Sequence, residues 1–244
     1  MRRAIPFTAL ILVAALVLSG FSSQEVVSGR RRATASSPPS VHTYCAGSVG
    51  TTSPATVNCT TPSAPNIGAS GDSLVLWVYA DGAVTLGSPS GCATWGAAKA
   101  TYSSTNQMYF WVAAATASGS CTPTISGTFT GTHEITIYMW DTQNTLTTVD
   151  GTAGLTFTSF CTSCTTPNTA ATSTSSSGGL ALAVARNPSL TAWTGSWTGL
   201  TTLSPNGLPI PSAYQVQSGS GAIYSSWTSS GNSSYNGIIV IKHS

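Results

Sequence analysis

Two tryptophans, Trp193 and Trp197, lie four residues apart in a segment rich in Thr and Gly, with few apolar neighbours. If this segment is extended, both rings lie on one face, about 13 Å apart. Aromatic rings stack on the apolar faces of pyranose rings, and neighbouring hydroxyl groups can bind those of a sugar. The pair therefore predicts a binding site for neutral glycan. The alternative is that one or both rings cover the end of the hydrophobic core, because buried Trp is common.

Carboxylates are the second set of groups that can carry chemistry, because glycoside hydrolysis needs two of them on opposite sides of the scissile bond. Asp72 and Asp81 lie next to glycines, as turn residues do. The remaining arrangement pairs Glu134 with Asp141 or Asp150, but no spacing selects it. A glycoside hydrolase that uses this pair is therefore the less favoured alternative, and we expect no catalytic residue.

Histidines offer little support for hydrolysis or metal binding. His42 precedes the predicted strands, His133 begins one, and His243 is the penultimate residue. The sequence has no G-x-S-x-G motif, in which a nucleophilic Ser is held on a strained turn. We expect neither a cofactor nor a metal site.

Six cysteines, an even number, predict three disulfides in an oxidising compartment. Many connectivities are open, and pairing of neighbours along the chain is the simplest: Cys45–Cys59, Cys92–Cys121 and Cys161–Cys164. The last pair forms a C-x-x-C unit. No second unit or nearby His completes a zinc site, and no helix follows as in a redox motif. A structural disulfide is therefore the better interpretation.

The N-terminus has the features of a signal peptide. Two arginines precede an uncharged stretch over residues 4–24, whose most apolar part covers residues 9–18. We assign residues 1–24 to a signal peptide, 25–40 to a flexible lead-in and 41–244 to one domain. An uncleaved anchor, flanked by the arginines at 30–32, is the alternative, but the apolar run is shorter than the roughly 20 residues of a spanning helix. We expect a secreted protein, extracellular or at the cell surface, without stable membrane insertion after cleavage.

Charge is scarce in the predicted domain. Residues 41–244 contain three basic and five acidic side chains, a net charge of 3 − 5 = −2. No basic patch exists, so nucleic acid is not an expected partner. Ser, Thr, Gly and Asn must form most of the surface, which suits contact with neutral material such as polysaccharide or a cell-surface component.

Strand patterns recur along the whole domain, and helical periodicity is almost absent. The clearest strands are expected at residues 73–80, 107–115, 133–141, 179–186, 213–218, 222–228 and 235–242. Several are apolar on both faces, which indicates central positions. The segment 179–186 places three alanines on one face, where a close neighbour or a long loop can pack. We predict an all-β, disulfide-stapled, two-sheet β-sandwich of jelly-roll type.

The order of several segments resembles a recurrent exported bacterial β-sandwich module. These segments are GDSLVLWV at 71–78, EITIYMWDTQNTLTTVDGTAG at 134–154, and a final hairpin that contains AIYSSWTSS and YNGIIVIK. The resemblance covers about residues 65–243 and departs from the family's EYSG pattern at residues 139–142. It implies export and a role at the cell surface or outside it, and it names no catalytic residue.

Three functions follow in order of preference. The first is a secreted, non-catalytic module that binds neutral glycan or cell-surface material through Trp193 and Trp197. The second is a structural adhesin, filament or coat subunit, which would self-associate through an unpaired apolar edge strand. The third is the hydrolase described above.

Overall fold

The computed structural model describes most of the chain after residue 36. The described residues are 37–82, 84–103, 106–150, 155–158, 172–174, 177–186, 190–223, 225, 227–229 and 235–244. The predicted signal peptide and most of the lead-in lie outside these ranges, as do Cys161 and Cys164. No helix within the described residues has the length and hydrophobicity needed to cross a membrane.

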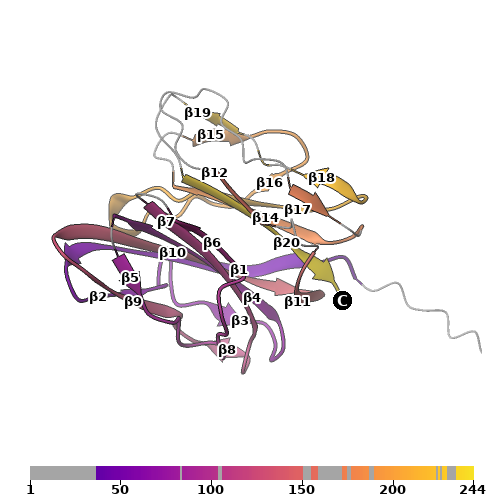
Figure 1. Cartoon of the computed structure of the whole chain (residues 1–244). Helices are drawn as coiled ribbons and strands as arrows, with labels where there is room; N and C mark the ends of the chain where they lie inside the picture. Colours follow the sequence, from indigo (N-terminus) through magenta and orange to yellow (C-terminus); the bar gives the residue numbers. More distant parts are fainter. Residues whose placement is uncertain are drawn as a thin grey trace, which may run out of the picture. The chain divides into compact units, whose positions relative to one another are not determined.

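The central sheet is the layer on which the others are built (Figure 1). Its five antiparallel strands follow the order β1 (Ser40–Thr52), β10 (Thr132–Gln143), β4 (Ser73–Asp81), β7 (Asn106–Ala114) and β6 (Ala100–Ser103). Side chains alternate between the two faces of a strand. In β4, Leu76 points to one face and Trp77 to the other, and both are fully buried. The central sheet therefore needs a cover on each side.

Two groups of strands supply these covers and complete a three-layer core. One face packs against the sheet β2 (Ala55–Asn58), β9 (Thr124–Phe129) and β5 (Val84–Leu86), beside the short pair β3 (Asn66–Ile67) and β8 (Gly119–Ser120). The other face packs against a six-stranded sheet. Its strands are β11 (Thr145–Val149), β12 (Leu155–Thr158), β20 (Tyr235–His243), β14 (Leu180–Arg186), β17 (Ser212–Val216) and β16 (Thr198–Gly199).

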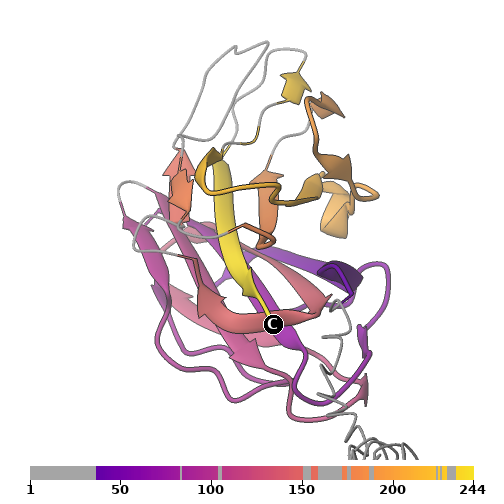
Figure 2. The ribbon, with the colours of Figure 1, turned by 90° about the vertical axis from the view of Figure 1, so that its right-hand side faces the viewer.

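The outer face of the six-stranded sheet carries two further strand pairs. They are β13 (Thr172–Thr174) with β18 (Gly221–Ile223), and β15 (Leu190–Trp193) with β19 (Trp227–Ser229). The side view in Figure 2 shows these orange and yellow segments on the far side of the C-terminal sheet from the purple strands. Ala181 lies on this outer face, where Ile223 and Trp197 pack over it. The small residues of β14 thus admit a close neighbour, as their pattern predicts.

The all-β fold is confirmed, with several antiparallel sheets where two were expected. The jelly-roll order of strands stays a prediction. One helical element occurs among the described residues, the single turn η1 (Pro205–Gly207). The predicted strand at 222–228 is wrong as one element, because β18 and β19 divide it and pair with different partners.

Strand β1 has no counterpart among the predicted strands. It contains two glycines, which weaken a strand pattern. Gly47 is required by a close approach of two backbones, because a Cβ there would lie 2.1 Å from the carbonyl oxygen of Asn58. The contacts that define this strand are therefore made with residues distant in the sequence, and its own residues show no hydrophobic alternation that predicts a strand.

Two disulfides lie on the side of the central sheet that β2 covers. They join Cys45 to Cys59 and Cys92 to Cys121, with Cα–Cα distances of 5.4 Å in both. These are the pairings of neighbours along the chain. They indicate that the domain matures in an oxidising environment of the extracellular type.

The two-sided burial of β4 generates a stability prediction. Leu76→Ala removes a fully buried side chain and should lower the free energy of unfolding by about 2–5 kcal/mol. Leu146→Ala is the matched control, because Leu146 is 44% exposed and its truncation should change stability by no more than about 0.5 kcal/mol. Urea unfolding of both variants measures the difference. Equal losses would contradict the three-layer arrangement.

Candidate functional site

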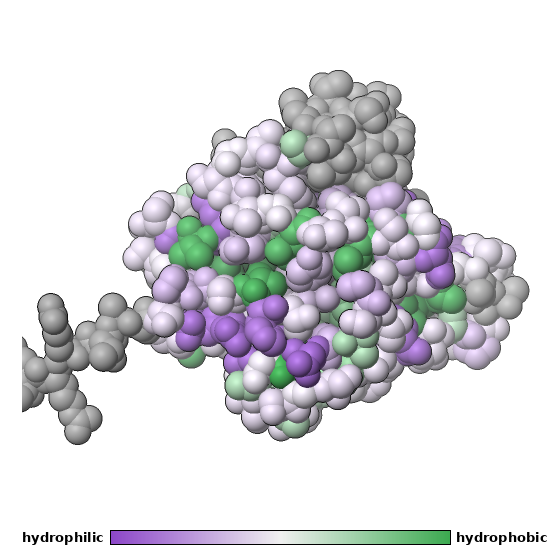
Figure 3. All heavy atoms as spheres, turned by 180° about the vertical axis from the view of Figure 1, so that it is seen from behind, coloured by the Kyte–Doolittle hydropathy of each residue, from purple (hydrophilic) through white to green (hydrophobic). Residues whose placement is uncertain are grey.

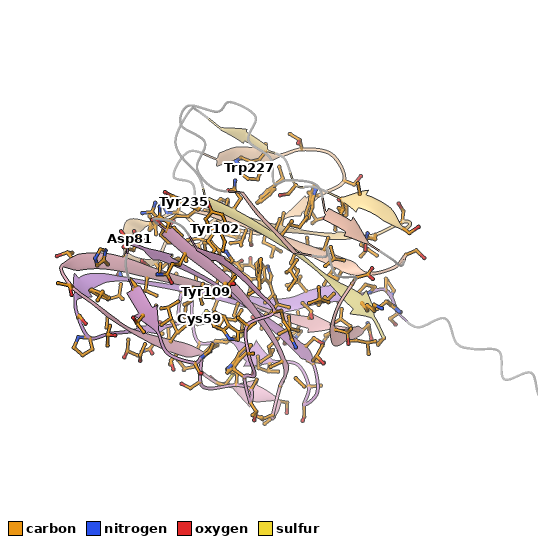
Figure 4. All side chains as sticks on the ribbon, in the orientation of Figure 1. Cys59, Asp81, Tyr102, Tyr109, Trp227 and Tyr235 are labelled. Atoms are coloured by element: carbon orange, nitrogen blue, oxygen red, sulfur yellow. A yellow bond between two sulfur atoms is a disulfide. The ribbon has the colours of Figure 1, made fainter. Side chains whose placement is uncertain are left out.

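Three tryptophans gather over the outer face of the six-stranded sheet. Trp193 and Trp227 are directly opposite each other in the pair β15–β19, with ring centroids 5.2 Å apart and a T-shaped arrangement. Trp193 and Trp197 have centroids 6.2 Å apart and ring planes inclined by 33°. Trp227 is fully buried, while the other two are half-buried. Figure 4 shows Trp227 beneath the short strands at this end of the molecule.

The chain between Trp193 and Trp197 turns instead of extending. Gly195 has φ +76°, a left-handed conformation that favours glycine. The expected separation of about 13 Å in an extended segment is therefore wrong, and the two rings are neighbours. Gly199 of β16 lets the ring of Trp193 lie close to the sheet, since a Cβ at this position would lie 3.0 Å from Cδ1 of Trp193.

A cavity of about 440 Å³ opens beside Trp197. Gln215 of β17 and Ala222 and Ile223 of β18 line it, together with the turn that contains Thr194, Gly195 and Ser196. Its volume lies in the range of small-molecule sites. None of these described lining residues is charged, so the cavity offers one aromatic ring, amide and hydroxyl groups, and a small apolar wall.

Trp197 and Trp193 have different positions relative to this cavity. Trp197 lines it and also packs against the buried outer-face cluster that contains Val240. Trp193 is not among the lining residues; it contacts the rings of Trp197 and Trp227. Trp197 therefore borders the cavity, and Trp193 packs against Trp197 from outside it.

A second cavity, of about 460 Å³, lies at another part of the molecule, over the start of β10. It contains Asp81, His133 and Glu134. Glu134 is in a bidentate ion pair with Arg186, with Nη2–Oε2 and Nε–Oε1 distances of 2.6 and 3.2 Å. The Arg186 guanidinium also lies over the ring of Tyr79, 5.1 Å from its centroid.

This cluster joins the central sheet to the six-stranded sheet. Burial raises the pKa of Tyr79, which stays neutral and donates to Asn106 at 3.1 Å. Asn106 donates in turn to Tyr235 of β20. Asp81 and Tyr235 lie near one another at this end of the sheets in Figure 4. The Glu134 carboxylate is thus held by an ion pair between layers, an arrangement with an evident structural role.

The structure separates the acids that sequence reasoning paired for hydrolysis. Glu134 and Asp141 are seven residues apart on β10, about 23 Å, and on opposite faces. The backbone N–H of Asp150 donates to the carbonyl of Val240 on β20. Arg186, the ion-pair partner of Glu134, lies opposite Tyr235, five residues away along the same strand. Neither Asp141 nor Asp150 can therefore work with Glu134 on one glycosidic bond.

Asp141 is instead a buried anchor for the start of the domain. Its side chain is fully buried, and Oδ2 accepts hydrogen bonds from His42 Nδ1 and the backbone N–H of Gly68, both at 3.0 Å. His42 occupies an irregularity of β1 between Val41 and Thr43. Such bulges re-aim side chains. Burial raises the pKa of Asp141, although the bonds from Gly68 and His42 oppose the shift.

Several residues of the tryptophan cavity were missed in the sequence. Gln215 lies on the outer face of β17, opposite Ala181, and Gln217 follows the end of that strand directly. The Gly- and Ser-rich run at residues 218–221 follows directly. The spacing of the two glutamines before a turn is a usable signal, but nothing local places it beside Trp197.

Comparison of the chain with protein-family models, with curated proteins and with solved structures finds no match.

The buried carboxylate yields a prediction for pH. Because the pKa of Asp141 is raised above its ordinary value of 3.8, the folded protein binds this proton more tightly than the unfolded chain. The free energy of unfolding then falls as pH rises from the ordinary to the raised value. Asp141→Asn cannot ionise, so its stability relative to the wild type should increase over that interval.

Urea unfolding of the wild type and Asp141→Asn between acid and neutral pH measures this difference. A variant that instead loses stability relative to the wild type as pH rises would show that the hydrogen bonds from His42 and Gly68 outweigh the cost of burying the charge.

Proposed function

We propose that residues 41–244 form a secreted, non-catalytic module that binds neutral glycan at the cavity beside Trp197. The observation that carries the proposal is the composition of that cavity. A half-buried indole, Gln215 and two hydroxyl residues line a space of about 440 Å³ without a charged group. Sugars present apolar C–H faces and hydroxyl groups, which match an aromatic surface surrounded by neutral hydrogen-bonding groups.

Support for the ring makes this surface suitable for binding. Trp197 is packed against the outer-face cluster below and against Trp193 at its side. Trp193 is itself held by the buried Trp227. A ring fixed before binding loses little conformational freedom when the ligand arrives, which favours affinity.

The exposed surface favours glycan binding over self-assembly. The outer edge of β1 is engaged by backbone hydrogen bonds between Ala46 and Thr61, and Asn206 donates to the carbonyl of Ser48. Leu146 and Val216 are the exposed large apolar side chains among the described residues. On the face shown in Figure 3, the apolar residues form small separate groups. A broad apolar surface, typical of an assembly interface, is not seen on that face.

Retention on insoluble polysaccharide tests the proposal with the mature chain. Trp197→Ala should weaken retention at least about fivefold, because truncation of an aromatic anchor typically costs more than about 1 kcal/mol. Trp95→Ala is the control, since Trp95 is also half-buried but packs against the opposite core cluster. Binding should be almost unchanged between about 50 and 200 mM salt, unlike binding to phosphates.

Trp197→Ala can lower stability, so a second variant keeps the test decisive. Gln215→Leu is similar in size and removes only the amide, and it should weaken retention about fivefold. Thermal melts of each variant confirm folding. Absence of retention on cellulose, chitin, xylan, mannan and starch, or full retention by both folded variants, would refute the proposal.

A further inference from the structure

A second depression, of about 170 Å³, continues from the tryptophan cavity. The two share three residues, Gln215, Ala222 and Ile223. The second depression is further lined by Gln217 and the residues 218–221 that connect β17 to β18. The two depressions therefore adjoin at these residues, and together they are called the Trp197 groove.

The two parts of the groove differ in chemistry. The first part has the indole of Trp197, whereas Ala222 and Ile223 line both parts. The second part has no aromatic residue among its described lining residues and offers Ser218, Ser220 and glutamine side chains. The first part can therefore stack on a sugar ring, whereas the second offers mainly hydrogen-bonding groups.

The polar end is held in shape by the sheet. The backbone N–H of Gln217 donates to Gly179, and the N–H of Gly178 donates to Gln217, both at 2.8 Å. These bonds extend the pairing of β14 with β17 by one step. The side-chain amide of Gln217 also approaches the carbonyl of Gly219, at 3.5 Å. Gln217, at the start of the connection, is thus fixed to the sheet before a ligand binds.

Resting on the proposed function, we infer that the ligand is a neutral oligosaccharide of at least two units that occupies two adjoining subsites. One sugar unit stacks on Trp197, and the next is bound by the polar groups of residues 217–220, with Gln215 between them. Trp197 lies across β17 from Gln215, because Thr198 pairs with Tyr214, whereas Gln217 lies two residues along the chain from Gln215. The two subsites therefore meet at Gln215, and a ligand that fills both must contain at least two sugar units.

Gly219 allows the second subsite to be closed without touching the first. It has open space where a Cβ would lie, and its φ is outside the left-handed region. Gly219→Leu therefore introduces a bulky group at the edge of the polar depression without backbone strain. Gly50→Leu is the matched control, because Gly50 also has open space and an ordinary φ but lines the separate cavity over β10.

The experiment is a calorimetric titration with one, two and four units of the sugar whose neutral polymer the mature protein retains. For the wild type and Gly50→Leu, affinity should rise at least about tenfold from one unit to four, which corresponds to about 1.4 kcal/mol. In Gly219→Leu the rise should fall below about threefold while binding of the single unit is kept. Trp197→Ala should weaken binding at every length.

Each other result overturns a defined part of the inference. Equal affinity of the wild type for one and four units, or an unchanged length dependence in Gly219→Leu, would refute the second subsite and leave the proposed function standing. Failure to bind any of these glycans would refute the proposed function itself.

Discussion

Burial of β4 and β10 on both faces is the constraint on which the other layers depend. Leu76 and Trp77 are neighbours in the chain, point to opposite faces and have no exposed surface. A sheet with one face exposed to solvent cannot contain such a strand, because half of the strand's apolar side chains would remain in water. The chain meets this need with a small disulfide-linked sheet on one side and the six-stranded sheet on the other.

The six-stranded sheet faces the same constraint on its own outer side, and the candidate site arises there. Ile238 and Val240 of β20 point outward and are fully buried. The cover over them consists of short strands and the turn around Gly195. Ala181 and Gly199 lack bulk, so the indoles of Trp197 and Trp193 can approach the sheet closely. Rings that complete a cover of this kind keep one side packed and leave the other available to a ligand.

The few charges of the domain are largely used inside it. Arg186 and Glu134 join two sheets through a partly buried ion pair, and Asp141 anchors His42 and Gly68. An ion pair of this kind contributes little net stability, because desolvation offsets attraction, yet loss of one partner is costly. These groups therefore specify how layers meet, while the Trp197 groove is left neutral.

Local patterns in the sequence determined the strand class and much of the core. Alternation at residues 73–80 and 179–186 predicts strands apolar on both faces, and the structure has β4 and β14 there. The pairing of Cys45 with Cys59 agrees with the simplest of the connectivities that the sequence leaves open, that of neighbours along the chain. Alternation and proximity are properties of neighbouring residues, so they can be read without knowledge of the fold.

Tertiary structure alone decided where these strands meet and which side chains share a site. The strand β1, the division between β18 and β19, and the groove that joins Trp197 to Gln215 all depend on pairing between distant segments. The same holds for Glu134, whose partner Arg186 is 52 residues away. Such contacts are selected by the burial of whole sheets against each other, and no local spacing of residue types records that selection.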